Sequence, residues 1–291
     1  MGHKAGFVSI IGKPNVGKST LMNAMIGEKL SIITPKAQTT RHRIRGIISD
    51  DDFQVVFSDT PGLLKSNYKL HEAMMAVVKE SVEDADMLLF MVELGEKPEN
   101  HDFIRLVDEA EVPVLLLISK IDLAKDNELI EAIAAWGQAS PKAKVIPVSA
   151  REGINLGQVM QTIIDALPES PPYFPKEDIT DRPLRFFVAE TIREKIFLYY
   201  RREIPYATTV IVDSYQEGEQ LDRIHALIFV ERDSQKAILL GHEGKAIKKV
   251  GIESRKEIEE FIGKQIYLEL TVKVSKDWRN SHEMLKRYGY E

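Results

Sequence analysis

The sequence predicts an α/β domain with a mostly parallel, doubly wound sheet, followed by a smaller α+β domain. Three observations predict this organisation. Strands and helices alternate from residue 5 to about 167, a proline-rich stretch follows at residues 167–178, and the order of elements changes beyond it. The length of 291 residues fits two domains. We expect these domains at residues 1–168 and 184–291, with a stiff linker at residues 169–183.

The first domain is predicted from short apolar runs that alternate with helical patterns. Several of the runs are continuously apolar, which is typical of central strands covered on both faces. The alternation favours parallel strands joined by helices. The predicted strands are 6–11, 43–49, 54–59, 87–93, 112–119 and 144–149, and the predicted helices are 19–27, 69–84, 99–110, 127–138 and 156–166.

The second domain is predicted from a different order of elements. The segment 167–178 contains four prolines, which cannot continue a helix or a central strand. A long surface loop within one domain is the alternative interpretation. The α-β-β-α-α-β order beyond this segment predicts a separate α+β domain. Its elements are expected at 184–200, 208–215, 224–232, 234–240, 245–262 and 265–274.

Composition excludes several classes of protein. The chain has no cysteine, which excludes disulfides and thiolate metal sites and fits a reducing compartment. The longest apolar runs, 87–92 and 112–118, are much shorter than the roughly 20 residues of a membrane span. The net charge is −6, yet residues 241–291 carry 11 Lys and Arg against 9 Asp and Glu. We therefore expect a cytoplasmic protein whose mildly basic C-terminal part can receive a polyanion.

The pattern between the first strand and the first helix indicates nucleotide binding. Residues 12–19, GKPNVGKS, match G-x-x-x-x-G-K-[ST] in the strand–loop–helix context that this motif requires. Such a P-loop wraps backbone N–H groups around a β-phosphate, and the helix N-terminus adds positive potential. We expect Lys18 to bridge the β- and γ-phosphates and Ser19 to ligate Mg²⁺. The residues expected to line this site are Gly12, Lys13, Pro14, Asn15, Val16, Gly17, Lys18, Ser19 and Thr20.

Two further segments are expected to sense the γ-phosphate. In the turn DTPG at residues 59–62, Asp59 is placed to hold a water on the same Mg²⁺, and Gly62 leaves its N–H free to approach the γ-phosphate. The polar segment 32–46 offers Thr40 as a second hydroxyl ligand, available only while the γ-phosphate is bound. An ordinary turn and a solvated loop are the alternatives. The candidate catalytic residues are Lys18, Thr40 and Gly62, and the candidate Mg²⁺ ligands are Ser19, Thr40 and, through water, Asp59.

Selection of guanine is expected from two later segments. SKID at residues 119–122 is similar to the N-K-x-D pattern of guanine-selective domains, and VSA at 148–150 supplies a backbone N–H for guanine O6. Asp122 would accept hydrogen bonds from N1–H and the exocyclic amine, which adenine cannot both donate. Lys120 is expected to lay its stem along the base and to tie back to the P-loop. Because serine replaces asparagine, we expect the guanine preference to survive with reduced affinity. The residues expected at the base are Ser119, Lys120, Asp122, Ser149 and Ala150.

With these motifs in place, the chain resembles the Era family of bacterial GTPases, in the TrmE/Era group, over nearly its whole length. The resemblance rests on GKPNVGKSTLMNAMIG, KAQTTRHRIRG, DTPGL, SKID and VSA in the first domain, and on IREKIF, EIPYA and a glycine motif in the second. KAQTTRHRIRG is notably specific to this family. The resemblance implies a P-loop GTPase domain, GTP and GDP as ligands, and slow Mg²⁺-dependent hydrolysis of GTP to GDP and phosphate.

The glycine motif of the second domain is typical of a type II KH domain. GHEG at residues 241–244 lies between two predicted helices and matches G-x-x-G, a turn that clamps about four nucleotides of single-stranded RNA. A lone G-x-x-G often marks only a packing corner, but the surrounding order of elements matches the type II KH topology. The helix N-terminus and its lysines favour phosphate, whereas Glu243 is mildly unfavourable. The expected RNA-binding residues are Gly241, His242, Glu243, Gly244, Lys245, Lys248 and Lys249.

The family resemblance adds expectations that the residues alone do not supply. The RNA would be 16S rRNA near its 3′ end, the process would be maturation of the 30S subunit, and the protein would be a monomer with peripheral contact to the inner face of the membrane. Asn15 matches the asparagine with which cation-activated relatives hold K⁺, although asparagine also suits such a loop conformationally, and both interpretations stay open. Leu63 occupies the place of the water-orienting glutamine of Ras-like enzymes. Trp278 and the basic tail either touch RNA or cap the domain.

Three hypotheses of function follow. The leading one is a GTP-driven RNA-binding switch, in which GTP and Mg²⁺ order residues 32–46 and the segment after Gly62 and so bias the KH domain. The second is a constitutive RNA-binding assembly protein with a structural nucleotide site, and the intact Mg²⁺ ligands argue against it. The third is an ATP-dependent RNA enzyme, which Asp122 and the lack of helicase motifs disfavour.

Overall fold

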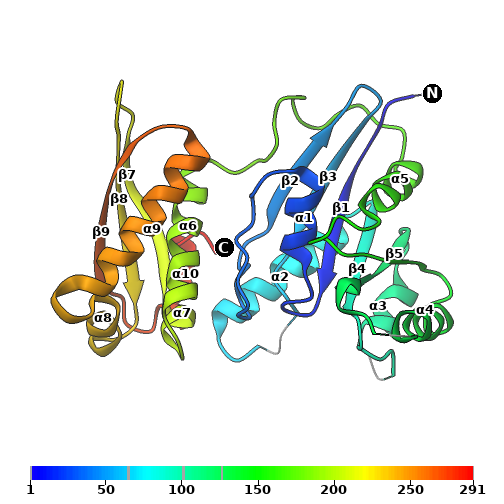
Figure 1. The fold of residues 1–291 in the computed structure, drawn as a ribbon, viewed down its shortest axis with the longest axis horizontal. Helices are drawn as coiled ribbons and strands as arrows, with labels where there is room; N and C mark the ends of the chain where they lie inside the picture. Colours follow the sequence, from blue (N-terminus) through cyan, green and yellow to red (C-terminus); the bar gives the residue numbers. More distant parts are fainter. Residues whose placement is uncertain (1, 64–65, 100–101, 126, 291) are drawn as a thin grey trace. The chain divides into compact units, whose positions relative to one another are not determined.

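The computed structural model describes residues 2–63, 66–99, 102–125 and 127–290, and its chain divides into two compact units (Figure 1). The unit boundary late in the chain falls between Asp181 and Arg182. The predicted bounds of 1–168, 169–183 and 184–291 stay a prediction. Unit 1 comprises Met1–Ser31, Thr40–Lys65 and Met74–Asp181, and unit 2 comprises Ile32–Thr39, Ser66–Ala73 and Arg182–Glu291.

Unit 1 is built on a six-stranded sheet with the strand order β2-β3-β1-β4-β5-β6. All neighbouring strands are parallel except β2, which pairs antiparallel with β3 at the edge. The central strands are almost entirely buried, as their continuous apolar runs predicted. The strands are β1 (Lys4–Gly12), β2 (Ile44–Ser49), β3 (Phe53–Asp59), β4 (Met87–Glu93), β5 (Val114–Ser119) and β6 (Lys144–Pro147).

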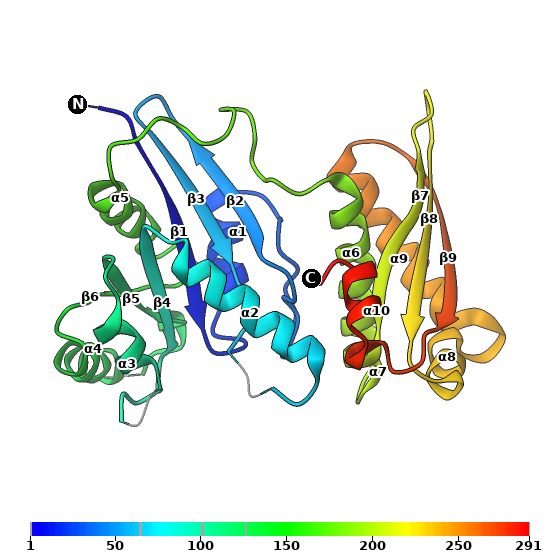
Figure 2. The same cartoon turned by 180° about the vertical axis from the view of Figure 1, so that it is seen from behind.

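Helices cover both faces of this sheet. Figures 1 and 2, which view the chain from opposite sides, show α1 over one face and α2 over the other. Residues 100 and 101 of the helix predicted at 99–110 lie outside the described residues. The helices are α1 (Lys18–Ile26), α2 (Lys69–Glu83), α3 (Asp102–Glu109), α4 (Glu128–Ala139) and α5 (Leu156–Ala166), with a 3₁₀ turn η1 (Ile121–Leu123). The α/β fold class with a mostly parallel sheet is confirmed.

The proline-rich stretch lies along the edge of unit 1. The backbone N–H of Tyr173 donates to Gln54 Oε1 at 2.7 Å, and Gln54 Nε2 donates to the carbonyl of Phe174 at 2.8 Å. Further along, the N–H of Ile47 in β2 donates to the carbonyl of Ile179 at 2.9 Å. The bonds of Gln54 join the stretch to β3, and the bond of Ile47 gives a partner to the backbone of β2, the edge strand, which would otherwise present an unpaired N–H there.

Unit 2 contains a three-stranded sheet of order β7-β8-β9, in which β7 and β8 are antiparallel and β8 and β9 are parallel. Its main elements follow the predicted α-β-β-α-α-β order, to which two short helices are added, α7 between α6 and β7 and α10 after β9. The elements are α6 (Leu184–Tyr199), α7 (Ile204–Ala207), β7 (Thr209–Gln216), β8 (Asp222–Val230), α8 (Asp233–Leu240), η2 (His242–Gly244), α9 (Lys245–Ile262), β9 (Ile266–Val274), η3 (Trp278–Asn280) and α10 (His282–Arg287).

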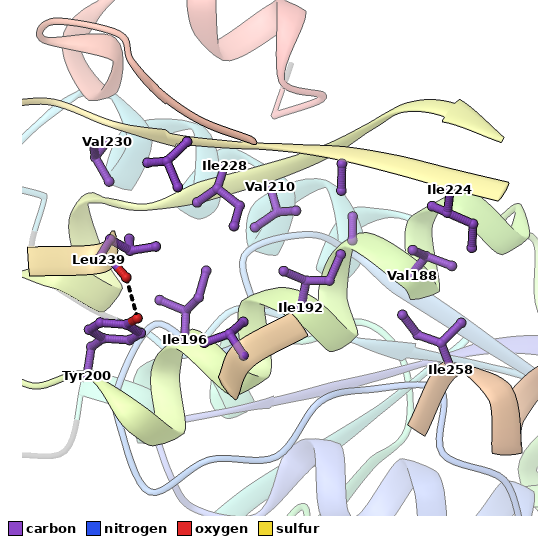
Figure 3. Packing of buried hydrophobic residues seen from close by; sticks show 14 of the residues in the cluster. Val188, Ile192, Ile196, Tyr200, Val210, Ile224, Ile228, Val230, Leu239 and Ile258 are labelled. Carbon is purple, nitrogen blue, oxygen red and sulfur yellow. Dashed lines mark hydrogen bonds between the residues drawn. The ribbon is translucent and has the colours of Figure 1, made fainter. Parts of the chain in front are cut away.

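The core of unit 2 forms where α6 packs on the sheet (Figure 3). Ile192 and Ile196 of α6 are four residues apart, so both lie on the helix face that meets Ile228 of β8. All three are fully buried, and each such side chain stabilises the fold by about 1.5–3 kcal/mol. The Tyr200 hydroxyl donates to the carbonyl of Leu239 at 2.6 Å, which fixes the end of α6 to the last turn of α8.

The C-terminal residues pack against β8 and the end of α7. Trp278 is fully buried, and its Nε1 donates to the carbonyl of Ala207 at 2.9 Å. Tyr288 packs on Phe229 of β8 with ring centroids 4.8 Å apart. Of the two expectations for Trp278, capping the domain is therefore the role that its burial supports. Within the described ranges, the chain has no helix that is both long enough and apolar enough to span a bilayer.

Candidate functional site

The P-loop of residues 12–17 joins β1 to α1, at the sheet edge where parallel strands end and ligands of open α/β sheets bind. Lys18 is only 6% exposed, and its Nζ donates to the carbonyls of Gly12 at 3.0 Å and Lys13 at 2.9 Å. Burial lowers the pKa of Lys18 to about 8, and the charge of Asp59 partly opposes that change. An anionic phosphate beside Nζ would raise this pKa again, so Lys18 is suited to hold one.

The other side chains of the P-loop lie in different environments. Lys13 pairs with Glu96 at 2.5 Å, and Val16 is buried. Asn15 has a positive φ of 63°, a conformation that asparagine tolerates better than most residues. What these residues can offer a phosphate is chiefly their backbone N–H groups, as a P-loop requires.

Three side-chain oxygens converge beside the first turn of α1. Ser19 Oγ donates to Asp59 Oδ2 at 2.6 Å and lies 3.0 Å from Thr40 Oγ1, which is itself 3.4 Å from the same carboxylate oxygen. Mg²⁺ binds oxygens at about 2.0–2.1 Å in octahedral geometry, so neighbouring ligands are roughly 2.9 Å apart. The separation of Ser19 and Thr40 fits two neighbouring positions of such an ion.

Asp59 provides an independent test of this fit. Its side chain is fully buried, and its Oδ1 has no hydrogen-bond partner in the part of the chain that the structure describes. Burial raises the pKa of Asp59, while the hydrogen bond from Ser19 and the charge of Lys18 act in the opposite direction. A buried carboxylate with an oxygen left over is costly unless a cation or water compensates it. The residues present therefore fit a Mg²⁺ ion with a water on Asp59.

Gly62 lies directly against the P-loop. A Cβ added to Gly62 would lie 2.7 Å from both the Cα and the N of Pro14, and the N–H of Leu63 donates to the carbonyl of Gly12 at 3.3 Å. Only glycine permits this approach, which places the turn beside the phosphate loop. The Leu63 side chain packs against the apolar cluster of β4 and β5, so it supplies no group for orienting water. Residues 64 and 65 of the following segment lie outside the described residues.

A cavity of about 230 Å³ continues from the P-loop to the ends of β5 and β6. Asp122 is oriented at its wall because its Oδ1 accepts a hydrogen bond from Ser149 Oγ at 2.6 Å. The predicted base-binding residues all line this cavity, together with Met91, Leu123 and Arg151, which were not predicted. The lining comprises Val16, Gly17, Thr20, Met91, Ser119, Lys120, Asp122, Leu123, Ser149, Ala150 and Arg151.

Ser119 and Lys120 have partners that the sequence did not indicate. Ser119 Oγ is within hydrogen-bonding distance of two carbonyls, at 2.8 Å from Val16 O and 2.9 Å from Val92 O. The serine thus keeps the P-loop attached to β5 but is committed to that role. Lys120 Nζ pairs with Glu93 at 2.7 Å, whereas the sequence predicted that Lys120 would tie back to the P-loop.

The G-x-x-G turn of residues 241–244 joins α8 to α9 and is exposed. Gly241 has φ 69° and ψ 179°, and a Cβ there would lie 2.6 Å from Ala246 Cβ, so the turn requires glycine. The side chains of His242 and Glu243 are 83% and 67% exposed. Lys245 at the start of α9 pairs with Glu243 at 2.8 Å. The turn therefore presents a backbone and a cation to solvent.

The neighbouring positions divide between surface and core. Lys248 is exposed, whereas Lys249 lies over the ring of Tyr199 at 4.3 Å. Ile238 is 52% exposed beside the turn, and Val250 is fully buried. Lys248 and Lys249 lie three and four residues after the lysine that begins α9, so all three share one face of the helix, and cations on one face suit the phosphates of a polynucleotide strand.

Two known families match the chain. The one described as "50S ribosome-binding GTPase" matches residues 7–120, and the one described as "KH domain" matches residues 203–279. The GTPase Era of Geotalea daltonii is 47% identical over 99% of this chain and 98% of its own length. The chain belongs to the Era family of GTPases. The chloroplastic GTPase ERA-like protein of Oryza sativa subsp. japonica, another member, is 45% identical over 99% of this chain and 70% of its own length.

Solved Era structures agree with this assignment. Aquifex aeolicus Era, solved as a variant bound to GDP·AlF4⁻, has 37% identity and a TM-score of 0.94, over 99% of both chains. An Era in complex with MgGDPNP and nucleotides 1506–1542 of 16S ribosomal RNA matches with the same values. The predictions of a GTPase of this family and of an attached KH domain are confirmed.

Proposed function

We propose that this Era-family protein is a GTP-dependent RNA-binding switch that binds 16S rRNA near its 3′ end and assists maturation of the 30S subunit. The observation that carries this proposal is the match over 99% of the chain to an Era that holds MgGDPNP and a 16S rRNA segment together. In the nucleotide half, Lys18, Gly62 and Thr40 act on the γ-phosphate, and Ser19, Thr40 and Asp59 hold Mg²⁺. Convergence of these three oxygens within 3.4 Å supports that assignment.

In the RNA half, the G-x-x-G turn and the lysines of α9 bind single-stranded RNA. Support comes from the exposure of the turn and from Gly241, whose backbone conformation leaves no room for a side chain. The helix N-terminus at Lys245 favours phosphate oxygens. Guanine selection rests on Asp122, which Ser149 holds at the wall of the cavity.

The proposal includes K⁺ at Asn15 on the family resemblance. The positive φ of Asn15 accounts for an asparagine at this position on conformational grounds, so K⁺ coordination would be a second role of the same residue. Turnover of GTP in K⁺ compared with Na⁺ at equal ionic strength tests it. Equal rates would remove K⁺ from the proposal and leave the rest intact.

A cytoplasmic monomer with peripheral contact to the inner face of the membrane completes the proposal, again on the family resemblance. Light scattering during gel filtration tests the monomer. Flotation with anionic vesicles tests the membrane contact, because peripheral binding to such lipids depends on basic surface residues.

The experiment that tests the switch is RNA crosslinking with mapping of the bound nucleotides, in the presence of GDPNP or GDP. We expect crosslinks from the 3′ end of 16S rRNA to the G-x-x-G turn that are stronger with GDPNP. A scrambled RNA of the same length controls for charge alone. Equal footprints in both nucleotide states would contradict the switch and favour a constitutive RNA-binding protein.

A further inference from the structure

The segment Ile32–Thr39, which precedes the proposed Mg²⁺ ligand Thr40, groups with unit 2. It is a closed loop. Thr34 Oγ1 and Thr39 Oγ1 are 2.6 Å apart, Thr39 Oγ1 donates to the carbonyl of Lys36 at 2.7 Å, and the N–H of Lys36 donates to Thr34 Oγ1 at 3.2 Å. With both ends linked, the loop behaves as one body, so a contact at any point constrains its last residue.

Helix α6 holds this loop by polar contacts at two of its residues, Ile33 and Lys36. The N–H of Ile33 donates to Glu194 Oε1 at 3.0 Å. Lys36 Nζ donates to the carbonyl of Tyr200 at 2.6 Å and also to that of Phe197. The last carbonyls of a helix lack partners within the helix, and a lysine satisfies them while complementing the helix dipole. A residue of the loop therefore caps the end of α6.

The third contact is made by Arg193, which lies immediately N-terminal to Glu194 on α6. Its Nη2 donates to the carbonyl of Thr39. The guanidinium is fixed in place because Nε and Nη2 also donate to Glu190, at 2.7 and 2.5 Å, in a bidentate pair, and because it lies over the ring of Phe197 at 5.2 Å. The side chain is 1% exposed, so the direction of this bond is set by the core of unit 2.

The cost of burying this arginine argues against a role in stability alone. Its Nη1 has no hydrogen-bond partner among the described residues, and buried ion pairs are often no more stabilising than apolar side chains of equal volume. What an Arg–carboxylate pair does supply is a fixed orientation. Here that orientation directs the guanidinium at the carbonyl of Thr39, one residue before Thr40.

We propose that Arg193 is a positioning residue for GTP hydrolysis: by holding the carbonyl of Thr39 it places the hydroxyl of Thr40 for Mg²⁺. The Thr40 hydroxyl is 3.0 Å from Ser19 Oγ, so small rotations about the intervening peptide would remove it from the ion. Arg193 is not among the residues that line the nucleotide cavity, so its part is to position Thr40. This inference rests on the proposed role of Thr40 in Mg²⁺ binding.

The test replaces Arg193→Met together with Glu190→Gln in the full-length protein, so that no buried charge is left unpaired. Mg²⁺ is titrated against a fluorescent GDPNP analogue and against the corresponding GDP. We expect the Mg²⁺ midpoint for the GDPNP analogue to rise about ten-fold, as the loss of one charge-assisted hydrogen bond predicts. The midpoint for GDP should stay unchanged, because Thr40 binds the ion only beside a γ-phosphate. A defect in folding alone would impair both nucleotides.

Thr40→Ala separates this inference from the function on which it rests. If Thr40→Ala leaves the GDPNP midpoint unchanged, the proposed Mg²⁺ site fails. If it raises the midpoint and the Arg193→Met, Glu190→Gln protein does not, only the positioning role is overturned. Combining Thr40→Ala with the Arg193 substitutions should add no further shift, because both act through one hydroxyl. Additive shifts would overturn the inference.

A matched control is the pair Lys264–Asp222, which links the connection between α9 and β9 to the start of β8 in unit 2. Lys264→Met with Asp222→Asn should leave both Mg²⁺ midpoints unchanged. A shift equal to that of the Arg193 variant would mean that the Arg193 substitutions act through general stability.

If the Arg193 variant fails to bind GDP, Lys36→Met replaces it in the test. Lys36 is only partly buried, so this variant is expected to fold and to raise the GDPNP midpoint by about two-fold. No shift in Lys36→Met would then overturn the inference.

Discussion

Two glycine turns of this chain each precede a helix and are each proposed to bind phosphate, yet they differ in the state of the cation that follows. The P-loop ends at Gly17 with a φ of 106°, and the G-x-x-G turn ends at Gly244 with a φ of 72°. The next residue is a lysine in both. Lys18 is 6% exposed, whereas the side chain of Lys245 is 73% exposed. Similar local geometry thus places one cation in the interior and one in water.

Burial decides what each turn can recognise. Lys18 is held by two carbonyls beside the buried Asp59, and in a site with little water each charged contact is strong and fixed in direction. Lys245 pairs with Glu243 in solvent, where charges are screened and side chains are mobile. The first arrangement suits one triphosphate in one geometry. The second suits the variable backbone of an RNA strand, bound by several weak contacts that depend on salt.

The largest expected effect is that of Lys18→Ala, which removes the interior cation. GTP turnover should fall by at least about 10²-fold, because the lysine is preorganised for charge that develops on the γ-phosphate. Steady-state phosphate release measures it. Binding of 16S rRNA in the absence of nucleotide is the control for folding and should stay at the wild-type value. Turnover within a few-fold of the wild type would contradict the role assigned to burial.

The next effect concerns the backbone of the second turn. Gly241→Ala would bring a Cβ to 2.6 Å from Ala246 Cβ in a φ, ψ region nearly restricted to glycine, whereas Gly244 has no atom within 4 Å of an added Cβ in the described part of the chain. We expect Gly241→Ala to lower the free energy of unfolding of unit 2 by about 2–3 kcal/mol, and Gly244→Ala by about 1 kcal/mol.

Tryptophan fluorescence during denaturation measures this difference. Trp278 is buried in unit 2 and Trp136 in unit 1, so a Trp136→Phe background makes the signal report on unit 2. The same proteins are then assayed for RNA binding under native conditions. Equal losses of stability for the two glycine variants would show that the close approach to Ala246 is not what Gly241 permits.

The geometry of the candidate phosphate site could be expected from the sequence because it depends on local spacing. A P-loop requires a strand, a loop of set length and a helix, and all three can be recognised from the pattern of residues 6–27. Asp59 ends β3, whereas Thr40 precedes β2, which pairs antiparallel with β3 so that Ile44 lies opposite Asp59. This antiparallel edge pairing, which the alternating pattern did not predict, brings Thr40 and Asp59 to the same end of the sheet as Ser19.

What the sequence did not predict depends on packing between distant residues. The pairing of Lys120 with Glu93, the Met91 wall of the base cavity and the contact of Arg193 with Thr39 have no local pattern. Helices α7 and α10 contain four and six residues, too few for a helical period to be recognised. The grouping of residues 32–39 with unit 2 likewise becomes visible only in the folded chain.

The smallest expected effect has the opposite sign and tests whether the exposed turn works by charge alone. Glu243 Oε2 is 2.8 Å from Lys245 Nζ and its side chain is 67% exposed, so Glu243→Gln frees that lysine and removes a charge that repels phosphate. RNA affinity should rise about two- to three-fold near 0.05 M salt, and the gain should vanish near 0.5 M as screening shortens the range of the field. Fluorescence anisotropy with a 16S rRNA 3′ fragment measures both, and GTP turnover without RNA should not change. A loss of affinity would instead mean that the Glu243 carboxylate accepts a hydrogen bond from the RNA. The G-x-x-G turn would then recognise more than phosphate. The contrast between this turn and the P-loop would in that case be weaker than the exposure of Glu243 and Lys245 suggests.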